Sequence, residues 1–90
     1  MSLSEDCSQI LYLEASVNYT WIKYITGQKE LKSMTLKKVH HELTSFSLVR
    51  IHRKYSINKN YIKKLYPDRV EMINGHILPI ARRRNNFRVE

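Results

Sequence analysis

Short apolar segments separated by turns of only a few residues are the feature that most constrains this sequence. Residues 10–13 are apolar, and residues 19–25 are rich in the β-branched and aromatic side chains that strands favour. Between them lie Ser16, Val17 and Asn18, and serine and asparagine favour turns through local side-chain hydrogen bonds. Segments this short and close together leave no room for the crossover connections that parallel strands need. The sequence therefore predicts a mostly β fold built from antiparallel hairpins.

One segment breaks this pattern and predicts a helix. The Thr35 hydroxyl can cap a helix start, and Leu36, Val39 and Leu43 then recur at helical spacing. Residues 29–34, which precede it, can return as an antiparallel strand after a tight turn. We expect one principal short helix among the strands.

The second half carries the clearest hairpin of the chain. Residues 70–73 and 76–80 are strand-like, and Asn74 followed by Gly75 suits the positive φ angles of a two-residue turn. Residues 61–66 form a further segment, in which two lysines stand between apolar and aromatic residues. No internal repeat or linker divides the 90 residues, so we expect a single domain with a modest core.

A basic break interrupts the strand-like stretch of residues 46–58. Apolar residues stand at both ends of the stretch, whereas Arg50, His52, Arg53 and Lys54 form its middle. A segment that is anchored twice must present its charges from a fixed place. The plain interpretation of His52 is a half-buried side chain bonded to backbone, and we rank it above direct contact with a ligand.

The positive charge of the chain is concentrated in its second half. The formal net charge is +8, and residues 1–45 contribute five basic and five acidic side chains. Residues 46–90 hold eleven basic and three acidic side chains. This asymmetry suggests a polyanionic partner, with nucleic acid ahead of an anionic membrane surface, although a merely soluble basic surface would give the same charge. No apolar run approaches the roughly 20 residues that cross a bilayer, and no signal-peptide pattern opens the chain.

The histidines and the single cysteine form no recognisable metal motif. His40 and His41 are adjacent, so on a helix they point about 100° apart and cannot share an ion as an i, i+4 pair can. His52 and His76 lie on other elements, without a Cys-x-x-Cys pair or paired carboxylates. Cys7 alone cannot form an internal disulfide, which fits a reducing compartment such as the cytoplasm. We expect no metal and no cofactor.

Catalytic patterns are missing as well. Cys7 has no histidine in its motif, and Ser16 lies in no nucleophile-elbow pattern. The only glycines, Gly27 and Gly75, are both expected in turns, which leaves no glycine-rich cradle for a phosphate. We do not expect an enzyme.

Basic side chains are the remaining candidates for function. Guanidinium groups match phosphate oxygens and also the O6 and N7 edge of guanine. Tyrosines interleaved with them could stack on bases or could form the core and rim of a sheet. The candidates are Arg50, Arg53, Lys54, Lys59, Lys63, Lys64, Arg82, Arg83 and Arg84, with Tyr55, Tyr61 and Tyr66 among them.

An ordered set of short motifs resembles the LytTR DNA-binding domain. The most specific part is Phe-x-x-x-Arg-Ile-His-Arg-x-Tyr-x-x-Asn at residues 46–58. Ile-Leu-Tyr-Leu-Glu-Ala precedes it at residues 10–15, and Leu-Pro-Ile-Ala-Arg-Arg follows it at residues 78–83. The resemblance covers roughly residues 10–88. It implies an elongated arrangement of small antiparallel β-sheets with short helices, one of them the principal helix expected above.

The resemblance also implies that three loops read bases in successive major grooves. The implied base-contacting residues are Asn18, Tyr19 and Thr20 in the first loop, Arg53 in the second, and Arg82 and Arg83 in the third. We expect Lys54, Lys59, Lys63 and Arg84 to contact the DNA backbone, and Arg50, His52 and Asn58 to be structural. The family commonly has serine where this chain has Lys54 and Ala81.

The function implied by the resemblance is sequence-specific binding of double-stranded DNA by the effector domain of a bacterial two-component response regulator that controls transcription. We expect residues 1–9 to be a cloning remnant and lead, and residues 10–90 to be the DNA-binding domain. Implied partners are direct repeats in promoters, a second copy of the chain on DNA, and an upstream receiver domain of the phosphorelay, which this sequence lacks. Two alternatives stay open, namely a binder of single-stranded nucleic acid or RNA, and a protein-interaction module that pairs through a sheet edge.

Overall fold

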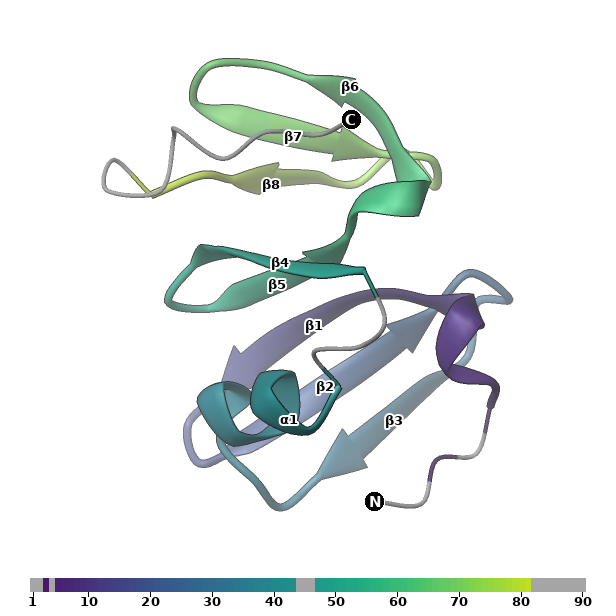
Figure 1. Ribbon diagram of the computed structural model, residues 1–90, viewed down its shortest axis with the longest axis vertical. Helices are drawn as coiled ribbons and strands as arrows, with labels where there is room; N and C mark the ends of the chain where they lie inside the picture. The colour runs from purple at the N-terminus through teal and green to yellow at the C-terminus, as the bar shows by residue number, and fades with distance from the viewer. Residues whose placement is uncertain (1–2, 4, 44–46, 82–90) are drawn as a thin grey trace.

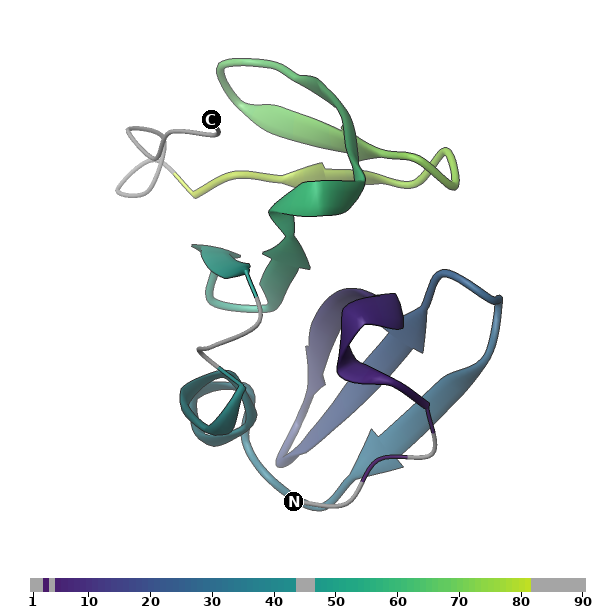
Figure 2. The ribbon, with the colours of Figure 1, turned by 45° about the vertical axis from the view of Figure 1, so that its right-hand side comes forward.

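Two antiparallel β-sheets are stacked along the long axis of the molecule (Figure 1). The computed structural model describes Leu3, residues 5–43 and residues 47–81. A five-stranded sheet has the order β3-β2-β1-β5-β4, and a three-stranded sheet has the order β6-β7-β8. Figure 2 shows the same stacking after rotation, with the three-stranded sheet beyond β4 and β5. The prediction of a mostly β, antiparallel fold with one principal short helix is confirmed.

The strands and helices are short, and most connections between them are tight turns. The five-stranded sheet contains β1 (Ile10–Ser16), β2 (Tyr19–Tyr24), β3 (Lys29–Lys32), β4 (Leu48–His52) and β5 (Tyr55–Asn58). The three-stranded sheet contains β6 (Ile62–Leu65), β7 (Arg69–Met72) and β8 (Ile77–Pro79). The helix is α1 (Leu36–Glu42), and single 3-10 turns, η1 (Cys7–Gln9) and η2 (Lys59–Tyr61), precede β1 and β6.

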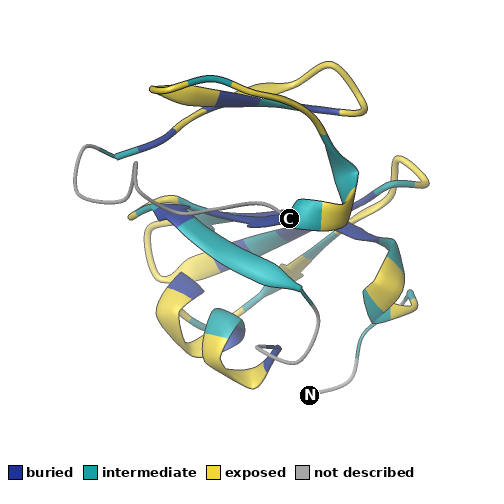
Figure 3. Ribbon diagram, turned by 45° about the horizontal axis from the view of Figure 1, so that its top comes forward, coloured by how far each residue is buried: buried dark blue, intermediate teal, exposed yellow. Residues whose placement is uncertain are grey.

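Strand β1 lies at the centre of the five-stranded sheet and contributes to two separate cores. Ile10 and Leu13 pack toward α1, whereas Leu11 and Tyr12 pack toward the three-stranded sheet. An irregularity in the pairing with β2, between Ile10 and Tyr12, interrupts the usual alternation of faces. Burial on both sides explains why this segment reads as a continuous apolar run. Figure 3 shows buried residues along the strands of both sheets, while the turns are exposed.

Helix α1 covers one face of the sheet, and its ends follow from local chemistry. The Thr35 side chain accepts a hydrogen bond from the backbone N–H of Lys38 at 3.4 Å, as expected for a cap. Leu36, Val39 and Leu43 are buried against the core side chains of β1 and β2. Each such side chain stabilises the fold by about 1.5–3 kcal/mol relative to an exposed one. The predicted helix and its cap are confirmed.

The stretch expected as an interrupted strand is a β-hairpin. Strands β4 and β5 pair in antiparallel register, and residues 53–54 form the turn between them. Phe46, expected to start the strand, lies outside the described residues. At the other end of the hairpin Asn58 is buried, and its amide nitrogen donates to the carbonyl oxygen of Ile10 at 2.8 Å. Its side-chain oxygen accepts from the backbone N–H of Asn60 and so caps η2.

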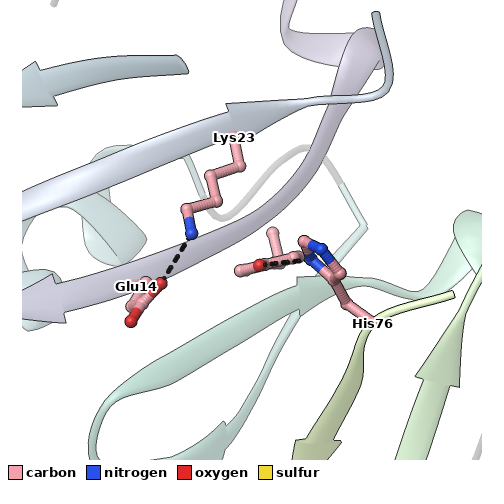
Figure 4. Close-up of polar contacts among 4 residues, drawn as sticks. Glu14, Lys23 and His76 are labelled. Carbon is pink, nitrogen blue, oxygen red and sulfur yellow. Dashed lines mark hydrogen bonds and ion pairs between the residues drawn. The ribbon is translucent and has the colours of Figure 1, made fainter. Parts of the chain in front are cut away.

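A hairpin connects β7 and β8 at the Asn-Gly pair, as predicted, but its turn is longer than the expected two residues: the strands end at Met72 and resume at Ile77, and Gly75 has a positive φ while Asn74 does not. Gly75 has φ +92°, a conformation that costs glycine little. The backbone N–H of Met72 donates to the carbonyl of His76 at 2.8 Å, which closes the hairpin. The His76 ring then reaches β1, where its Nδ1 lies 2.8 Å from the hydroxyl of Tyr12 (Figure 4). This contact joins the two sheets.

Candidate nucleic-acid interface

Three turns and the end of β8 lie on one side of the molecule, at the left of Figure 1. The turns are residues 17–18 between β1 and β2, residues 53–54 between β4 and β5, and residues 66–68 between β6 and β7. Beside them, β8 ends at Pro79 and the chain continues to Ala81. We call the surface made by residues 16–19, 52–55, 66–69 and 80–81 the loop end.

Backbone hydrogen bonds between strands fix the parts of the loop end relative to one another. The N–H of Ala15 donates to the carbonyl of Lys54 at 2.8 Å, which places the first two turns side by side. The N–H of Ala81 donates to the carbonyl of Ile51 at 2.7 Å. The N–H of Ile80 donates to the carbonyl of Asp68 at 3.0 Å. The end of β8 therefore lies between the second and third turns.

The turn of Arg53 and Lys54 is held by two side chains of its own hairpin. Arg50 donates from Nε to the carbonyl of His52 at 2.8 Å, and from a terminal nitrogen to the carbonyl of Arg53 at 2.7 Å. The half-buried His52 accepts at Nδ1 from the backbone N–H of Lys54 at 3.1 Å. Arg53 and Lys54 are themselves exposed. The hairpin thus presents two cations on a backbone whose carbonyls and N–H are already bonded.

The turn of Val17 and Asn18 has a different character. Val17 has φ 55°, in the left-handed region, which costs a non-glycine residue roughly 1–2 kcal/mol. Its side chain is 91% exposed, more than any other large hydrophobic side chain among the described residues. Asn18 is exposed, and Tyr19 is 46% exposed at the start of β2. Asn18 and Tyr19, both predicted to contact bases, therefore lie on the loop end, next to Val17, which the sequence prediction did not single out.

Thr20 is placed differently from its predicted role as a base-contacting residue. It is fully buried, and its hydroxyl donates to the carbonyl of Met34 at 2.7 Å. The reason is the twofold alternation of β2, in which Thr20, Ile22 and Tyr24 all face the core. This burial argues against Thr20 as a DNA contact.

The third predicted reading loop begins where the described part of the chain ends. Arg82, Arg83 and Arg84 lie outside the described residues, so their positions stay a prediction. Ala81, immediately before them, is bonded to Ile51 in the hairpin that carries Arg53. The chain therefore enters the arginine run from the loop end.

Lys59 and Lys63, both predicted to contact the DNA backbone, are not brought together with the loop end. Lys59 begins η2, at the opposite end of β5 from the Arg53–Lys54 turn, and its N–H donates to the carbonyl of Ser47. Lys63 lies in β6 and is exposed, with its ammonium nitrogen 3.8 Å from a carboxylate oxygen of Glu71. Neither position supports a contact shared with Arg53.

The third turn adds a cluster that the sequence prediction did not single out. The guanidinium carbon of Arg69 lies 4.2 Å from the ring centroid of Tyr66, and the ammonium of Lys64 lies 5.2 Å from it. Arg69 also pairs with Asp68 at 2.8 Å. A basic residue directly after a predicted turn was the available signal. Because Ile80 bonds to Asp68, this cluster borders the chain that leads to the arginine run.

The tyrosines divide between core and surface. Tyr55 and Tyr61 pack against the core shared by the two sheets, and the Tyr61 hydroxyl donates to the carbonyl of Ser8 at 2.7 Å. Tyr66 instead lies half-buried at the third turn, between its two cations. The core interpretation therefore holds for two of the three.

Polar side chains beneath the first two turns connect the strands that carry them. Lys23 pairs with Glu14 at 2.9 Å (Figure 4). Partial burial lowers the pKa of Lys23, but the hydrogen bond to Glu14 and the charges of Tyr12 and Glu14 outweigh it, so the pKa is raised from its ordinary value. Burial, with a smaller contribution from Glu14, raises the pKa of Tyr55. The carboxylate of Glu14, on β1, thus acts on side chains of both neighbouring strands, Lys23 on β2 and Tyr55 on β5.

A shallow groove of about 420 Å³ lies between α1 and β4. Five of its six lining residues carry basic groups, namely Lys37, Lys38, His40, His41 and Arg50, and the sixth is Thr35. Arg50 connects this groove to the Arg53–Lys54 turn, whose carbonyls it binds. The basic character of the loop end therefore continues toward the helix.

No group of three metal-ligating side chains comes together within the described residues. His40 lies 2.8 Å from the Ser56 hydroxyl, and His76 contacts Tyr12, so these two rings serve separate packing contacts. In the same part of the chain, no helix is long and apolar enough to cross a membrane.

Comparison with known proteins agrees with the fold. The sequence matches the LytTr DNA-binding domain family over residues 2–86, and this chain belongs to that family. One similar solved structure is the LytTr DNA-binding domain of a Bacillus cereus protein described as a methyl-accepting/DNA response regulator. It shares 27% sequence identity, with 89% of this chain and 77% of that chain covered and a TM-score of 0.80. No curated protein matches the sequence. The chain is a DNA-binding domain rather than an enzyme.

Proposed function

We propose that the loop end reads double-stranded DNA in a sequence-specific manner. The observation that carries the proposal is the hydrogen-bonded arrangement that places residues 17–18, residues 53–54 and Ala81 on one side of the molecule. Arg53 projects from a turn that Arg50 and His52 hold in place, so a base contact costs little ordering of the backbone. Arginine can bind the O6 and N7 edge of guanine with two hydrogen bonds.

The first two turns of the loop end and the arginine run that follows Ala81 have distinct proposed roles. Arg53, Arg82 and Arg83 contact base edges in the major groove, together with Asn18 and Tyr19 from the first turn. Lys54 and Arg84 contact phosphates. The longest dimension of the molecule is 33 Å, close to the ~34–36 Å of one turn of B-DNA, so a protein of this length can reach from one major groove to the next.

The description of the similar Bacillus cereus protein as a response regulator supports a regulatory role for this DNA binding. We propose that the chain is the effector domain of a bacterial two-component response regulator and controls transcription in the cytoplasm. An upstream receiver domain would then deliver the phosphorelay signal. Two copies would occupy direct repeats in a promoter, on one face of the DNA, when the repeats are spaced by about one helical turn.

The test begins with selection of bound sites from a random pool of duplexes. Arg53→Ala and Arg82→Ala should each cost about 1–3 kcal/mol on the selected site and relax its specificity at one base step. Lys63→Ala, away from the loop end, is the matched control and should weaken selected and scrambled duplexes equally and slightly. Affinity should also fall steeply with salt, because neutralised phosphates release counterions. If all three variants lost the same affinity for the selected and the scrambled duplex, the assignment of Arg53 and Arg82 as base-reading residues would be wrong.

The two competing functions make different predictions in competition assays. Single-stranded DNA or RNA should compete poorly, because Tyr55 and Tyr61 pack against the core and expose only part of their rings, which leaves them poor stacking platforms. Pairing through the edge strand β3 is disfavoured by Lys29 and Lys32, since edge lysines oppose strand addition. A single strand that displaces the selected duplex, or self-association through β3 without DNA, would favour the competing function.

A further inference from the structure

We propose that Val17 contacts the 5-methyl group of a thymine and thereby specifies one base pair of the binding site. This inference rests on the proposed reading of double-stranded DNA by the loop end. It assigns a base-specific role to a residue that the three-loop prediction did not include.

The side chain of Val17 is unusually exposed. Val17 is 91% exposed, whereas Leu31, Leu65 and Ile73, three other large exposed hydrophobic side chains, are 41–46% exposed. An isopropyl group that is almost fully exposed to water contributes nothing to the stability of the fold. It becomes favourable only when a partner removes it from water.

The backbone of the turn is strained at Val17. Val17 stands at φ 55°, where glycine or asparagine would be expected and where a β-branched side chain is unusual. The pairing of Ser16 with Tyr19 leaves only two residues for the turn, so this conformation is imposed by the hairpin. An apolar, branched side chain at a strained and exposed position has no stabilising role within the hairpin. Such strain is commonly found where a side chain serves a binding site.

The turn that carries Val17 also lies next to the two cations Arg53 and Lys54. The bond from Ala15 to Lys54 sets the Val17 turn beside the turn of Arg53 and Lys54. When Arg53 enters the major groove, the neighbouring turn faces the floor of the groove a few bases away. The apolar group that the floor of the major groove presents is the methyl of thymine. Asn18, next to Val17, can bond the adjacent base edge.

The experiment removes the methyl groups one at a time. Each thymine of the selected duplex is replaced by deoxyuridine, which pairs identically and lacks only the methyl, and Kd is measured for the 90-residue chain and for Val17→Gly. At one position the unaltered chain should lose about fourfold in affinity, as expected for one buried methyl. Val17→Gly should bind thymine and deoxyuridine equally at that position and keep its discrimination elsewhere. Its thermal unfolding should remain cooperative.

Two controls separate a methyl contact from a change in the turn. Val17→Thr keeps the branched shape and one methyl, and should retain part of the discrimination. Ile77→Ala removes another exposed side chain, 57% exposed at the start of β8, and should leave all discrimination unchanged. Loss of affinity in Val17→Gly on every duplex alike, or no thymine whose methyl effect depends on Val17, would overturn the inference. Failure of the unaltered chain to select any duplex would instead overturn the proposed function itself.

Discussion

The first two turns of the loop end are neighbours with opposite physical character. The Arg53–Lys54 turn is charged, and three hydrogen bonds from Arg50 and to His52 hold its backbone. The Val17–Asn18 turn is tipped by an apolar side chain and carries the unfavourable backbone angle of Val17. The bond from Ala15 to Lys54 joins them. One turn is supported by side chains of its own hairpin, and the other, among the described residues, by the pairing of the strands that it connects.

The difference shows two ways of fixing a reading loop. Side-chain bonds to turn carbonyls order the Arg53 backbone before DNA arrives, which reduces the entropy lost on binding. A two-residue connection between paired strands restricts Val17 by geometry alone, at the expense of strain. Removing the hydrogen bonds of Arg50 should therefore destabilise the Arg53–Lys54 turn. Relieving the backbone strain at Val17 should instead stabilise the Val17–Asn18 turn.

Of the variants that test this comparison, Arg50→Ala should have the largest effect on the free energy of unfolding and on DNA affinity. It removes two hydrogen bonds from a charged donor, to the carbonyls of His52 and Arg53, and should lower the free energy of unfolding by about 1–3 kcal/mol. Affinity for the selected duplex should fall at least as much as in Arg53→Ala, because the turn that carries Arg53 loses its support. Urea denaturation and DNA titration measure the two effects.

Arg50→Lys is the matched control for charge. It keeps the positive charge but cannot place two donors as a guanidinium does, so it should behave more like alanine than like arginine. Full stability and full affinity in Arg50→Lys would show that the charge, not the pair of bonds, matters.

Val17→Gly should change stability in the opposite direction and by less. Glycine adopts positive φ freely, so the free energy of unfolding should stay unchanged or rise by up to about 1 kcal/mol. Val17→Ala retains a Cβ and should gain less than glycine. A loss of stability of more than about 1 kcal/mol in Val17→Gly would mean that the exposed side chain supports the hairpin after all.

Lys23→Met should have the smallest effect. The pair with Glu14 is more than a quarter exposed on both sides, so solvent screening limits the loss at neutral pH to below about 1 kcal/mol. The folded-state pKa of Lys23 is raised, so its stabilisation is present below its unfolded pKa and is lost as pH rises through the folded value. Denaturation curves of the two proteins should therefore converge above about pH 10.5. A difference that grows with alkaline pH would contradict this sign.

Much of the fold could be predicted because its signals are local. The Thr35 cap, the spacing of Leu36 and Val39, and the positive φ of Gly75 each depend on a few neighbouring residues, and all are as expected. The alternation in β2 separates Thr20, Ile22 and Tyr24 from Tyr19, Trp21 and Lys23, but both sets contain apolar side chains. Only the tertiary structure shows that the face with Thr20 is the buried one.

The site was harder to predict than the strands because it is assembled from distant segments. Arg69 follows an ordinary turn, and only the bond from Ile80 to Asp68 brings that turn to the loop end. Lys59 and Lys63 carry the same charge in the same basic half, yet η2 and β6 lead them elsewhere. Charge counted along a chain does not distinguish these cases.

The sequence by itself determined most of the strand segments, the turn between β1 and β2, where the helix begins, and that the second half is basic, although it did not separate β4 from β5. These properties follow from side-chain periodicity, backbone preference and composition, each of which acts over a few residues. Only the tertiary structure decided which turns meet. The pairing of β1 with β5 joins residues more than forty positions apart, and it is this pairing that sets Val17 beside Lys54. Backbone hydrogen bonds between strands are chemically alike whatever the partner, so the choice of partner depends on packing of the whole core.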